Sequence, residues 1–390
     1  MEITELPKEN SRYNQVLKLL KQFDIHSAEK IEFVDSSHGE DDIRHNYIID
    51  KKYVLRINSA KVMTEERLTE LNTLIRRYHS FGMKAPLFLK AVTDRFVLEQ
   101  DGKYSYLSEY LDYPLADDVK HRCREDLRRQ RVVFTAKFAE AFKNVDLIET
   151  VSMYSIFDLA PYDKLSGLNI DEKQENLEQL VKDLKQAGYE DLAQKLNAKN
   201  EEIRSLLKPI YKELPRCVFQ GDENFSNLCV DEQDRIIGLF DFNMSGTEVC
   251  ANYLANNGFG NFYYEEEIVG KHTPTEILQM LLDAYRRGTE LICRHYSFTE
   301  QEFFAYRLYS QIAMFSAYWN TSAFAEFLRQ ENIKIKSRQS SNLSWMRSYP
   351  RGTKWKSNNT QRNESSMFCN LSVTCALKKI FGVGRSMGST

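Results

Sequence analysis

Apolar and polar positions repeat with two different periods along the chain, and the change of period separates a strand-rich first part from a helical remainder. Short apolar runs separated by polar turns predict an antiparallel meander over residues 30–34, 43–49 and 53–57. Two more strands are predicted at residues 96–99 and 104–110, around the turn Asp101-Gly102. The first hundred residues are therefore expected to form mainly an antiparallel sheet.

Amphipathic spacing predicts helices elsewhere. In the first part it indicates helices over residues 11–22 and 64–78, the second with Thr64 as its N-cap. Beyond residue 117 the chain turns helical, with further helices predicted over residues 124–144, 172–187, 190–214, 251–254, 274–287 and 299–319.

One stretch of the helical part breaks this pattern. Between residues 216 and 247, short apolar runs at 217–219, 228–230 and 236–240 predict strands, and the last two form a hairpin. The return strand brings Asp241 beside the polar loop that holds Asp222 and Asn227. Three oxygen-bearing side chains are thus expected to converge at one end of the hairpin.

This side-chain set suits phosphoryl transfer from a magnesium nucleotide. A carboxylate at Asp222 can orient a substrate hydroxyl and accept its proton. The amide oxygen of Asn227 and the carboxylate of Asp241 can hold Mg²⁺, which prefers hard oxygen ligands. Asp, Asn, Ser and Gly also favour ordinary turns, so a purely structural polar loop is the competing interpretation.

The segment Gln220–Leu228 resembles the His-Gly-Asp-x-x-x-x-Asn loop of the aminoglycoside phosphotransferase and choline kinase family. Leu239–Phe242 resembles the metal-binding motif of the same family. The resemblance implies that Asp222 is the catalytic base and that Asn227 and Asp241 are the metal ligands. Gln220 stands where the family usually has a structural His, so the local hydrogen bonding is expected to differ.

The resemblance also implies the fold class, which is α+β with the two lobes of a protein kinase. A small antiparallel-sheet lobe with one helix is expected over residues 1–111, as the nucleotide-binding part. A larger, mostly helical lobe that carries the catalytic hairpin and the substrate site is expected over residues 112–335. Residues 336–390 are rich in Ser, Asn, Arg and Lys, and are expected to form a basic disordered tail.

In such a small lobe a cation on the third strand contacts the nucleotide phosphates, and Arg56 occupies this position. A glutamate of the following helix would pair with it; Glu70 fits the family's pattern best, and Glu66 is the second candidate. Ser36 and the backbone near Gly39 are candidates for the phosphate loop. That loop has a single glycine, however, so an ordinary hairpin turn is an equally good interpretation.

Two further regions are candidates for ligand contacts. The strand that ends in Glu109, Tyr110 and Leu111 resembles the segment that links the two kinase lobes, where backbone groups contact the adenine. Aromatic residues beside an acidic run could hold an amine-bearing substrate through cation–π and charge contacts, and this gives Tyr263, Glu265 and Glu266 as candidates. A solvated acidic face is the competing interpretation for that run.

Composition and charge exclude several classes of protein. The 390 residues are 42% hydrophobic and 28% charged, which is ordinary for a globular protein. The seven cysteines form no Cys-x-x-Cys pair, and neither a signal peptide nor a long apolar run is visible, so a cytoplasmic protein without a membrane span is expected. Residues 335–390 contain ten basic residues and one acid, so the acidic remainder does not suggest nucleic-acid binding.

The sequence therefore predicts a small-molecule kinase, an enzyme that uses Mg²⁺ and ATP (or GTP) to phosphorylate a hydroxyl group. The acceptor, whether an aminoglycoside, a choline-like amine or a related metabolite, is not fixed by the fold. Two alternatives stay open, a nucleotide-binding pseudokinase and a helical interaction protein without a nucleotide site. A protein kinase is disfavoured, because no long activation segment follows Asp241.

Overall fold

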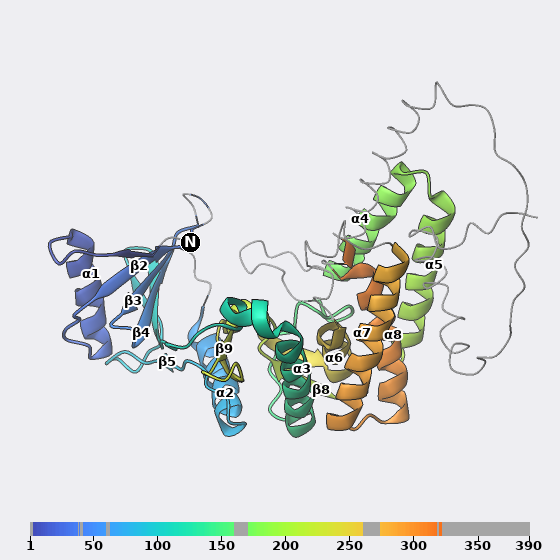
Figure 1. Ribbon diagram of the computed structural model, residues 1–390. Coiled ribbons are helices and arrows are strands. Elements are labelled where there is room, and N and C mark those ends of the chain that lie inside the picture. Colours follow the sequence, from blue (N-terminus) through green and yellow to red (C-terminus); the bar gives the residue numbers. More distant parts are fainter. Residues whose placement is uncertain are drawn as a thin grey trace, which may run out of the picture.

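The computed structural model of the chain describes residues 3–37, 39, 42–59, 63–159, 171–259, 274–317 and 320–321. A seven-stranded sheet forms one end of the molecule, and helices dominate the other (Figure 1). We call the sheet and helix α1 (Ser11–Leu20) the small lobe, and the part from Ala116 onward the large lobe. Helix α2 (Glu65–Ser80) lies between them (Figure 1).

The small-lobe sheet is antiparallel throughout, with the strand order β1-β2-β3-β4-β7-β5 and with β6 beside β7. Its strands are β1 (Ile3–Glu5), β2 (Ile31–Asp35), β3 (Arg44–Ile49), β4 (Tyr53–Asn58), β5 (Phe88–Leu89), β6 (Leu98–Gln100) and β7 (Lys103–Glu109). The predicted meander is confirmed as β2-β3-β4.

The two faces of this sheet differ because successive side chains of a strand point to opposite sides. On β4, Leu55 is fully buried in a core that also contains Val16 and Leu20 of α1. Its neighbour Arg56 lies opposite Tyr106 of β7, on the other face. One face of the sheet is therefore closed by α1, while the other carries the arginine.

A second and larger core joins α2 to both lobes. The apolar stripe of α2, which includes Leu71 and Tyr78, belongs to the same cluster as Tyr106 of the sheet and Phe138 of the large lobe. The Tyr78 and Phe138 rings are stacked, with their centroids 4.1 Å apart. Packing of this kind places α2 as a shared layer between sheet and helices, rather than as a helix of the small lobe alone.

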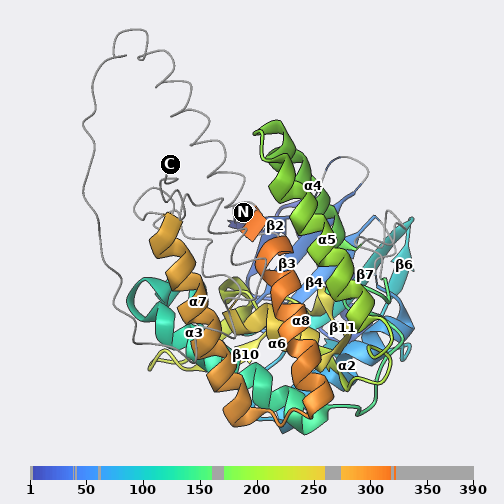
Figure 2. The ribbon, with the colours of Figure 1, turned by 90° about the vertical axis from the view of Figure 1, so that its right-hand side faces the viewer.

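Six long helices of the described chain build the large lobe, and Figure 2 shows it with this lobe toward the viewer. They are α3 (Ala116–Phe142), α4 (Glu172–Gln186), α5 (Glu190–Leu207), α6 (Cys250–Phe259), α7 (Pro274–His295) and α8 (Glu300–Ser316). Two antiparallel strand pairs complete it: β8 (Arg216–Phe219) with β11 (Gly246–Val249), and β9 (Leu228–Val230) with β10 (Ile236–Leu239). Of the short 3₁₀ turns, η1 (Lys21–Phe23) follows α1 in the small lobe, and η2 (Phe225–Asn227) and η3 (Phe242–Met244) lie in the large lobe.

Most of the predicted elements are present, and the differences lie at their ends. Helix α3 begins at Ala116 rather than near Arg124, with a break in helical geometry at Cys123, where φ is −142°. The helix predicted over residues 190–214 ends at Leu207. Strands β1, β5 and β11 were not predicted; they have two to four residues each, which is too short for a periodic pattern.

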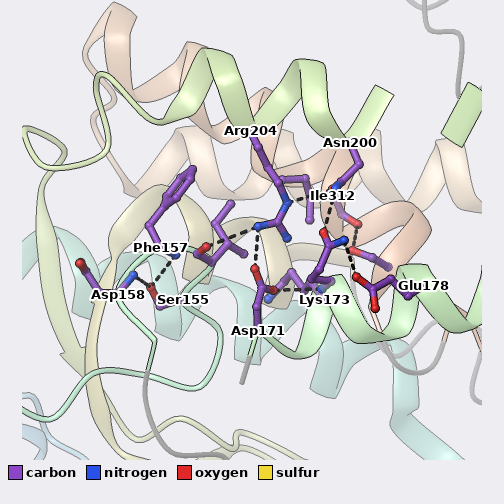
Figure 3. Close-up of polar contacts among 12 residues, drawn as sticks. Ser155, Phe157, Asp158, Asp171, Lys173, Glu178, Asn200, Arg204 and Ile312 are labelled. Atoms are coloured by element: carbon purple, nitrogen blue, oxygen red, sulfur yellow. Dashed lines mark hydrogen bonds and ion pairs between the residues drawn. The ribbon is translucent and has the colours of Figure 1, made fainter. Parts of the chain in front are cut away.

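Polar contacts attach the α4–α5 pair to the segment that follows α3 (Figure 3). Arg204 of α5 donates to the carboxylate of Asp171, the N-cap of α4, at 2.6 Å and to the carbonyl of Ile156 at 3.4 Å. Asn200 of α5 donates to the Gln174 side chain of α4 at 2.9 Å. The two helices are thus held to each other and to the loop by buried and partly buried polar groups.

A further contact connects this helical pair with the strand before the polar loop. Lys173 of α4 is buried, and its Nζ donates to the carbonyl of Tyr154 at 3.0 Å. The Tyr154 ring packs edge-on against Tyr253 of α6, which stacks on Phe219 at 3.8 Å between centroids. Phe219 ends β8, so the packing of α4 and α6 supports the start of the loop that carries Asp222.

Candidate active site

The loop between β8 and β9 holds Asp222 and Asn227 in direct contact. The Asn227 amide nitrogen Nδ2 donates to the backbone oxygen of Asp222 at 3.0 Å and to its carboxylate Oδ2 at 2.9 Å. These two bonds fix the amide orientation because the nitrogen faces Asp222. The Asn227 oxygen Oδ1 therefore points away from Asp222 and can accept a bond from another group.

The hairpin of β9 and β10 brings Asp241 to the same place. Leu239 pairs with Leu228 at the open end of the hairpin, and the Phe240 N–H donates to the backbone oxygen of Asn227 at 3.1 Å. Asp241 follows with a φ of 58°, a left-handed conformation that is uncommon for a residue with a side chain. Local backbone strain of this kind is concentrated at functional sites.

Gln220 ties the two loops together. Its side chain is fully buried, and its Nε2 donates to the carbonyls of Phe240 at 2.8 Å and Asp241 at 2.6 Å. Its Oε1 accepts the backbone N–H of Asp222 at 2.6 Å. One amide side chain therefore sets the distance between the backbones of Asp222 and Asp241. The sequence predicted that the hydrogen bonding here would differ from that of the family's His. In this chain the Gln220 side chain forms three hydrogen bonds that join the two loops.

Gly221 is required at the turn before Asp222. Its φ is +91°, and a Cβ atom at this position would lie 2.1 Å from the backbone oxygen of Met244. The chain after Asp241 thus packs against the chain before Asp222 more closely than any side chain would permit.

The electrostatics of the two aspartates favour a cation between them. Burial raises the pKa of Asp222 and the negative charge of Asp241 raises it further, while hydrogen bonds from Asn227 and Asn224 oppose the shift. Among the described residues neither aspartate forms an ion pair, so their mutual repulsion is not compensated by a side chain. A divalent cation would compensate it.

The donor set fits Mg²⁺ rather than a softer metal. It consists of two carboxylates and one amide oxygen, all hard ligands. Within the described part of the chain there is no group of three or more His, Cys, Asp or Glu side chains that would hold a metal by itself. The role of Asn227 and Asp241 as metal ligands stays a prediction.

Arg56 of the small lobe lies beside Ser108 and Tyr106 of β7. Its Nη1 donates to Ser108 Oγ at 2.8 Å, and its guanidinium lies 5.9 Å from the centre of the Tyr106 ring. Burial raises the pKa of Tyr106, the charge of Arg56 lowers it, and the charge of Asp241 raises it. Arg56, from the sheet, and Asp241, from the large-lobe hairpin, therefore both act by their charges on the Tyr106 hydroxyl.

Glu70 does not pair with Arg56 in this structure. Its carboxylate lies 3.5 Å from Arg67 Nη1 and accepts from Thr150 Oγ1 at 3.4 Å. Arg67 is buried and also donates to the carbonyl of Ser245 at 2.5 Å. The predicted pairing of Glu70 with Arg56 is therefore wrong for this structure. Because α2 packs on the large lobe, Glu70 lies beside the chain that follows Asp241 rather than beside β4.

The candidate phosphate loop is only partly described. Ser36 closes the β2–β3 turn, since its N–H and its hydroxyl both bond the carbonyl of Arg44, at 2.9 and 3.1 Å. The Asn46 side chain donates to Ser36 Oγ at 2.8 Å. Gly39 has a φ of +116°, which only glycine adopts readily. These bonds are those of a hairpin turn, and the role in phosphate binding stays a prediction.

At the end of β7 the backbone has the polarity that an adenine edge needs. The N–H of Glu109 donates to Leu87 O at 2.9 Å, and that of Tyr110 donates to Lys52 O at 2.8 Å. The N–H of Leu111 has no partner among the described residues. The Glu109 carbonyl accepts from the Ser108 hydroxyl at 3.1 Å. The contact of these backbone groups with adenine stays a prediction.

Several predicted residues lie outside the described ranges. Tyr263, Glu265 and Glu266, the candidates for amine binding, fall in the gap between α6 and α7, and residues 336–390 follow the last described residue. Their assignments stay predictions.

The side chains of α2 and α3 that support the Asp222 loop were not predicted from the sequence. Glu223 is buried next to Asp222; its carboxylate accepts from Thr135 of α3, and its carbonyl accepts from Arg131 of the same helix at 3.3 Å. Tyr78 of α2 accepts the N–H of Gln220 at 3.1 Å. In the sequence, the polar residues at positions 131 and 135 lie four apart on one face of a helix. Many solvated helices show the same spacing, so it does not predict a buried contact.

Comparison with known proteins decides the family. Residues 40–249, more than half of the chain, match the phosphotransferase enzyme family. The chain belongs to this family. It is a small-molecule kinase with the two-lobed, kinase-like α+β fold that the sequence predicted.

Solved structures align with this phosphotransferase over most of its length at low identity. They include an amicoumacin kinase (12% identity, TM-score 0.49, 95% of this chain and 93% of that chain). Aminoglycoside 2'-phosphotransferase-IIIa aligns at 12% identity with a TM-score of 0.40, over 85% and 97% of the two chains. A spectinomycin phosphotransferase aligns at 12% with a TM-score of 0.40, over 84% and 92%. No curated protein sequence matches the chain.

In the part of the phosphotransferase that the structure describes, none of the helices combines the length and the apolar character that crossing a bilayer requires.

Proposed function

We propose that the protein transfers the γ-phosphoryl group of ATP (or GTP), with Mg²⁺, to a hydroxyl group of a small molecule. The observation that carries the proposal is the contact of Asn227 with Asp222, together with the Gln220 bridge that holds Asp241 beside them. Family membership gives the reaction class, and this cluster supplies groups that the reaction needs.

Asp222 would accept the proton of the acceptor hydroxyl. Burial and the charge of Asp241 both raise its pKa, which makes its carboxylate a stronger base than an exposed aspartate. Its backbone and side chain are fixed by Gln220 and Asn227, so the carboxylate is held in position before the substrate binds.

The remaining groups would bind the nucleotide. Asn227 Oδ1 and the Asp241 carboxylate would hold Mg²⁺, which when bound neutralises phosphate charge. Arg56 would contact the phosphates from the small lobe, with its guanidinium held near Ser108. The backbone of Glu109 and Leu111 would contact the adenine edge.

The acceptor can be any of several hydroxylated classes, including aminoglycosides and choline-like amines. The relatives whose structures are known act on amicoumacin, aminoglycosides and spectinomycin, according to their names. A screen of ATP consumption against hydroxylated metabolites and antibiotics would identify it. Slow hydrolysis of ATP by water gives a signal before the acceptor is known.

The decisive experiment replaces Asp222 by Asn. We expect turnover to fall by about 100- to 10,000-fold, the usual contribution of a general base. Stabilisation by Mg-ATP in a thermal unfolding assay should be largely retained. Asp231→Asn, in the exposed turn of the β9–β10 hairpin, is the matched control. Parental turnover in Asp222→Asn would refute the assignment, and the absence of any nucleotide-dependent stabilisation in the parent would refute the nucleotide site.

A further inference from the structure

A cavity of about 320 Å³ lies in the large lobe between α3, α6 and α7. Its lining includes Arg131 and Val132 of α3, Gly258 of α6, and Ala284 and Arg287 of α7. Asp222, Asn227 and Asp241 are not part of the lining, so the cavity is separate from the candidate active site. Its volume is within the range of small-molecule sites.

The α6–α7 side of the cavity is rigid. A Cβ atom on Gly288 of α7 would lie 2.2 Å from the backbone oxygen of Gly258 on α6, so the two backbones are in contact there. Such a contact cannot close further, because no side chain separates the helices.

The charges around the cavity do not cancel. Four arginines and two carboxylates line it, and the carboxylates are already engaged. Glu125 pairs with Arg128 at 2.6 Å, and Asp126 pairs with Arg129 at 2.5 Å, both within α3. The positive charges of Arg131 and Arg287 remain.

Arg131 is a buried guanidinium without an ion pair in the described residues. Its side chain is 3% exposed, and its Nη atoms donate only to the carbonyls of Glu223 and Asn257, each at 3.3 Å. Its Nε has no hydrogen-bond partner. The Glu223 carboxylate lies close enough to act on Arg131 by its charge, but its hydrogen bond is with Thr135. The guanidinium also lies 5.8 Å from the centre of the Phe225 ring. A buried charge without an ion pair is costly, and an anion beside it would compensate that cost.

Arg287 completes a pair of cationic groups at the cavity. It is exposed, and within the described chain it forms neither a hydrogen bond nor an ion pair. Its neighbour Arg286 differs, since it pairs with Asp283 at 3.5 Å and does not line the cavity. The apolar residues of the lining are Val132, Ala284 and Leu291.

We propose that this cavity binds a small organic anion, with an apolar body against Val132, Ala284 and Leu291 and a phosphate or carboxylate group on Arg131 and Arg287. Arginine suits both groups because its planar fork matches two oxygens. The proposal is independent of the phosphoryl-transfer site. An occupant would nevertheless contact Arg131, the side chain that supports the carbonyl of Glu223 beside Asp222.

The test uses 1-naphthyl phosphate and 1-naphthoate as probes and uncharged 1-naphthol as their control. Binding is measured by isothermal titration calorimetry on the full chain, with and without saturating ADP, so that binding in the nucleotide cleft is separated from binding in the cavity. We expect at least one of the two anions to bind in the presence of ADP, and 1-naphthol to bind at least tenfold more weakly.

Variants show whether the probe binds in this cavity. Arg287→Ala should weaken binding at least tenfold, since it removes a charged hydrogen-bond donor, while Arg286→Ala should leave it unchanged. Leu291→Trp, which fills the cavity and keeps both arginines, should abolish it. Asp222→Asn should have no effect on it, so a failure of the proposed catalysis does not affect this result. Absence of binding at millimolar probe, or equal affinity in Arg287→Ala and the parent, would overturn the proposal.

Discussion

Two aspartates on either side of β9, Asp222 and Asp231, show how local surroundings separate a reactive carboxylate from a structural one. Asp231 accepts from the side chain and backbone of Arg235, which lowers its pKa. Asp222 has a raised pKa because it is partly buried beside Asp241. The residue type is the same, and the difference in pKa comes from burial, hydrogen bonds and nearby charges.

Gln220 is the residue whose loss should affect catalysis without touching substrate. Gln220→Ala removes three hydrogen bonds and leaves buried backbone groups unsatisfied, so we expect a loss of about 1–3 kcal/mol in the free energy of unfolding. Turnover should fall at least tenfold, because Asp222 and Asp241 lose their common support. Urea unfolding and steady-state kinetics measure the two effects.

The control is Gln233→Ala, in the exposed turn of the β9–β10 hairpin, which should change neither quantity. Gln220→His should lose less activity than Gln220→Ala, since an imidazole can replace part of the bridge. Parental turnover in Gln220→Ala would contradict the positioning role.

Glu248 should make the stability depend on pH. It is 2% exposed, and burial raises its pKa to about 7, against the opposing charges of Lys173 and Arg216. Below the ordinary pKa of 4.5 the folded and unfolded states are both protonated. As pH rises from there to about 7, the unfolded state ionises first, so this group progressively lowers the free energy of unfolding, by about 3 kcal/mol in all.

Denaturant unfolding between pH 4.5 and 8 measures this dependence, and Glu248→Gln should remove most of it. Glu232→Gln, in the turn of the β9–β10 hairpin, is the matched control. An identical pH profile for Glu248→Gln and the parent would show that Glu248 titrates normally.

At the scale of elements, the position of the α4–α5 pair depends on polar bonds as well as on apolar packing. Arg204 links α5 to the N-cap of α4 and to the loop at Ile156 (Figure 3). An ion pair with the same N···O distance lies at the hairpin surface, where Arg235 contacts Asp231, also at 2.6 Å. The two pairs differ in burial: the arginine is 15% exposed in the first and 68% in the second.

This difference predicts unequal costs of breaking the pairs. Arg204→Met should lower the free energy of unfolding by about 3 kcal/mol, because Asp171 is left partly buried without its partner. Arg235→Met should cost at most about 1 kcal/mol, since water replaces the guanidinium. Thermal and urea unfolding of both variants provide the comparison, and equal losses would contradict the anchoring role of Arg204.

At the scale of the whole molecule, the predicted nucleotide-binding residues come from both lobes. Arg56 comes from the sheet and Asp241 from the large-lobe hairpin, and α2 is packed between these parts. A ligand that contacts both should stabilise the molecule as one unit. With nucleotide at a hundredfold excess over its Kd, the expected gain is about 2.7 kcal/mol.

We therefore expect Arg56→Met and Asp241→Asn each to reduce the thermal stabilisation by Mg-ATP at a fixed concentration, although the two residues lie on different lobes. Arg76→Met, an exposed arginine of α2, is the control and should retain it. Removal of Mg²⁺ with a chelator should lower the effect of ATP in the parent and change little in Asp241→Asn. A full nucleotide response in both variants would place the site elsewhere.

Local sequence patterns were enough to predict the elements and the reaction class. Period-two and helical patterns are local, so β2, β3, β4 and most helices were predictable. Asp222, Asn227 and Asp241 could be brought together in advance because a tight hairpin leaves little freedom in where its ends meet.

The partners of side chains that are distant in sequence, in contrast, follow from the packing of the folded chain. The pairing of Glu70 with Arg67, the bridge made by Gln220 and the cavity beside Arg131 all depend on how α2, α3 and α7 pack. The physical reason is that a polar side chain in a helical pattern looks the same in sequence whether it faces water or a neighbouring element. Its burial and its partner are set by packing, to which residues from the whole chain contribute.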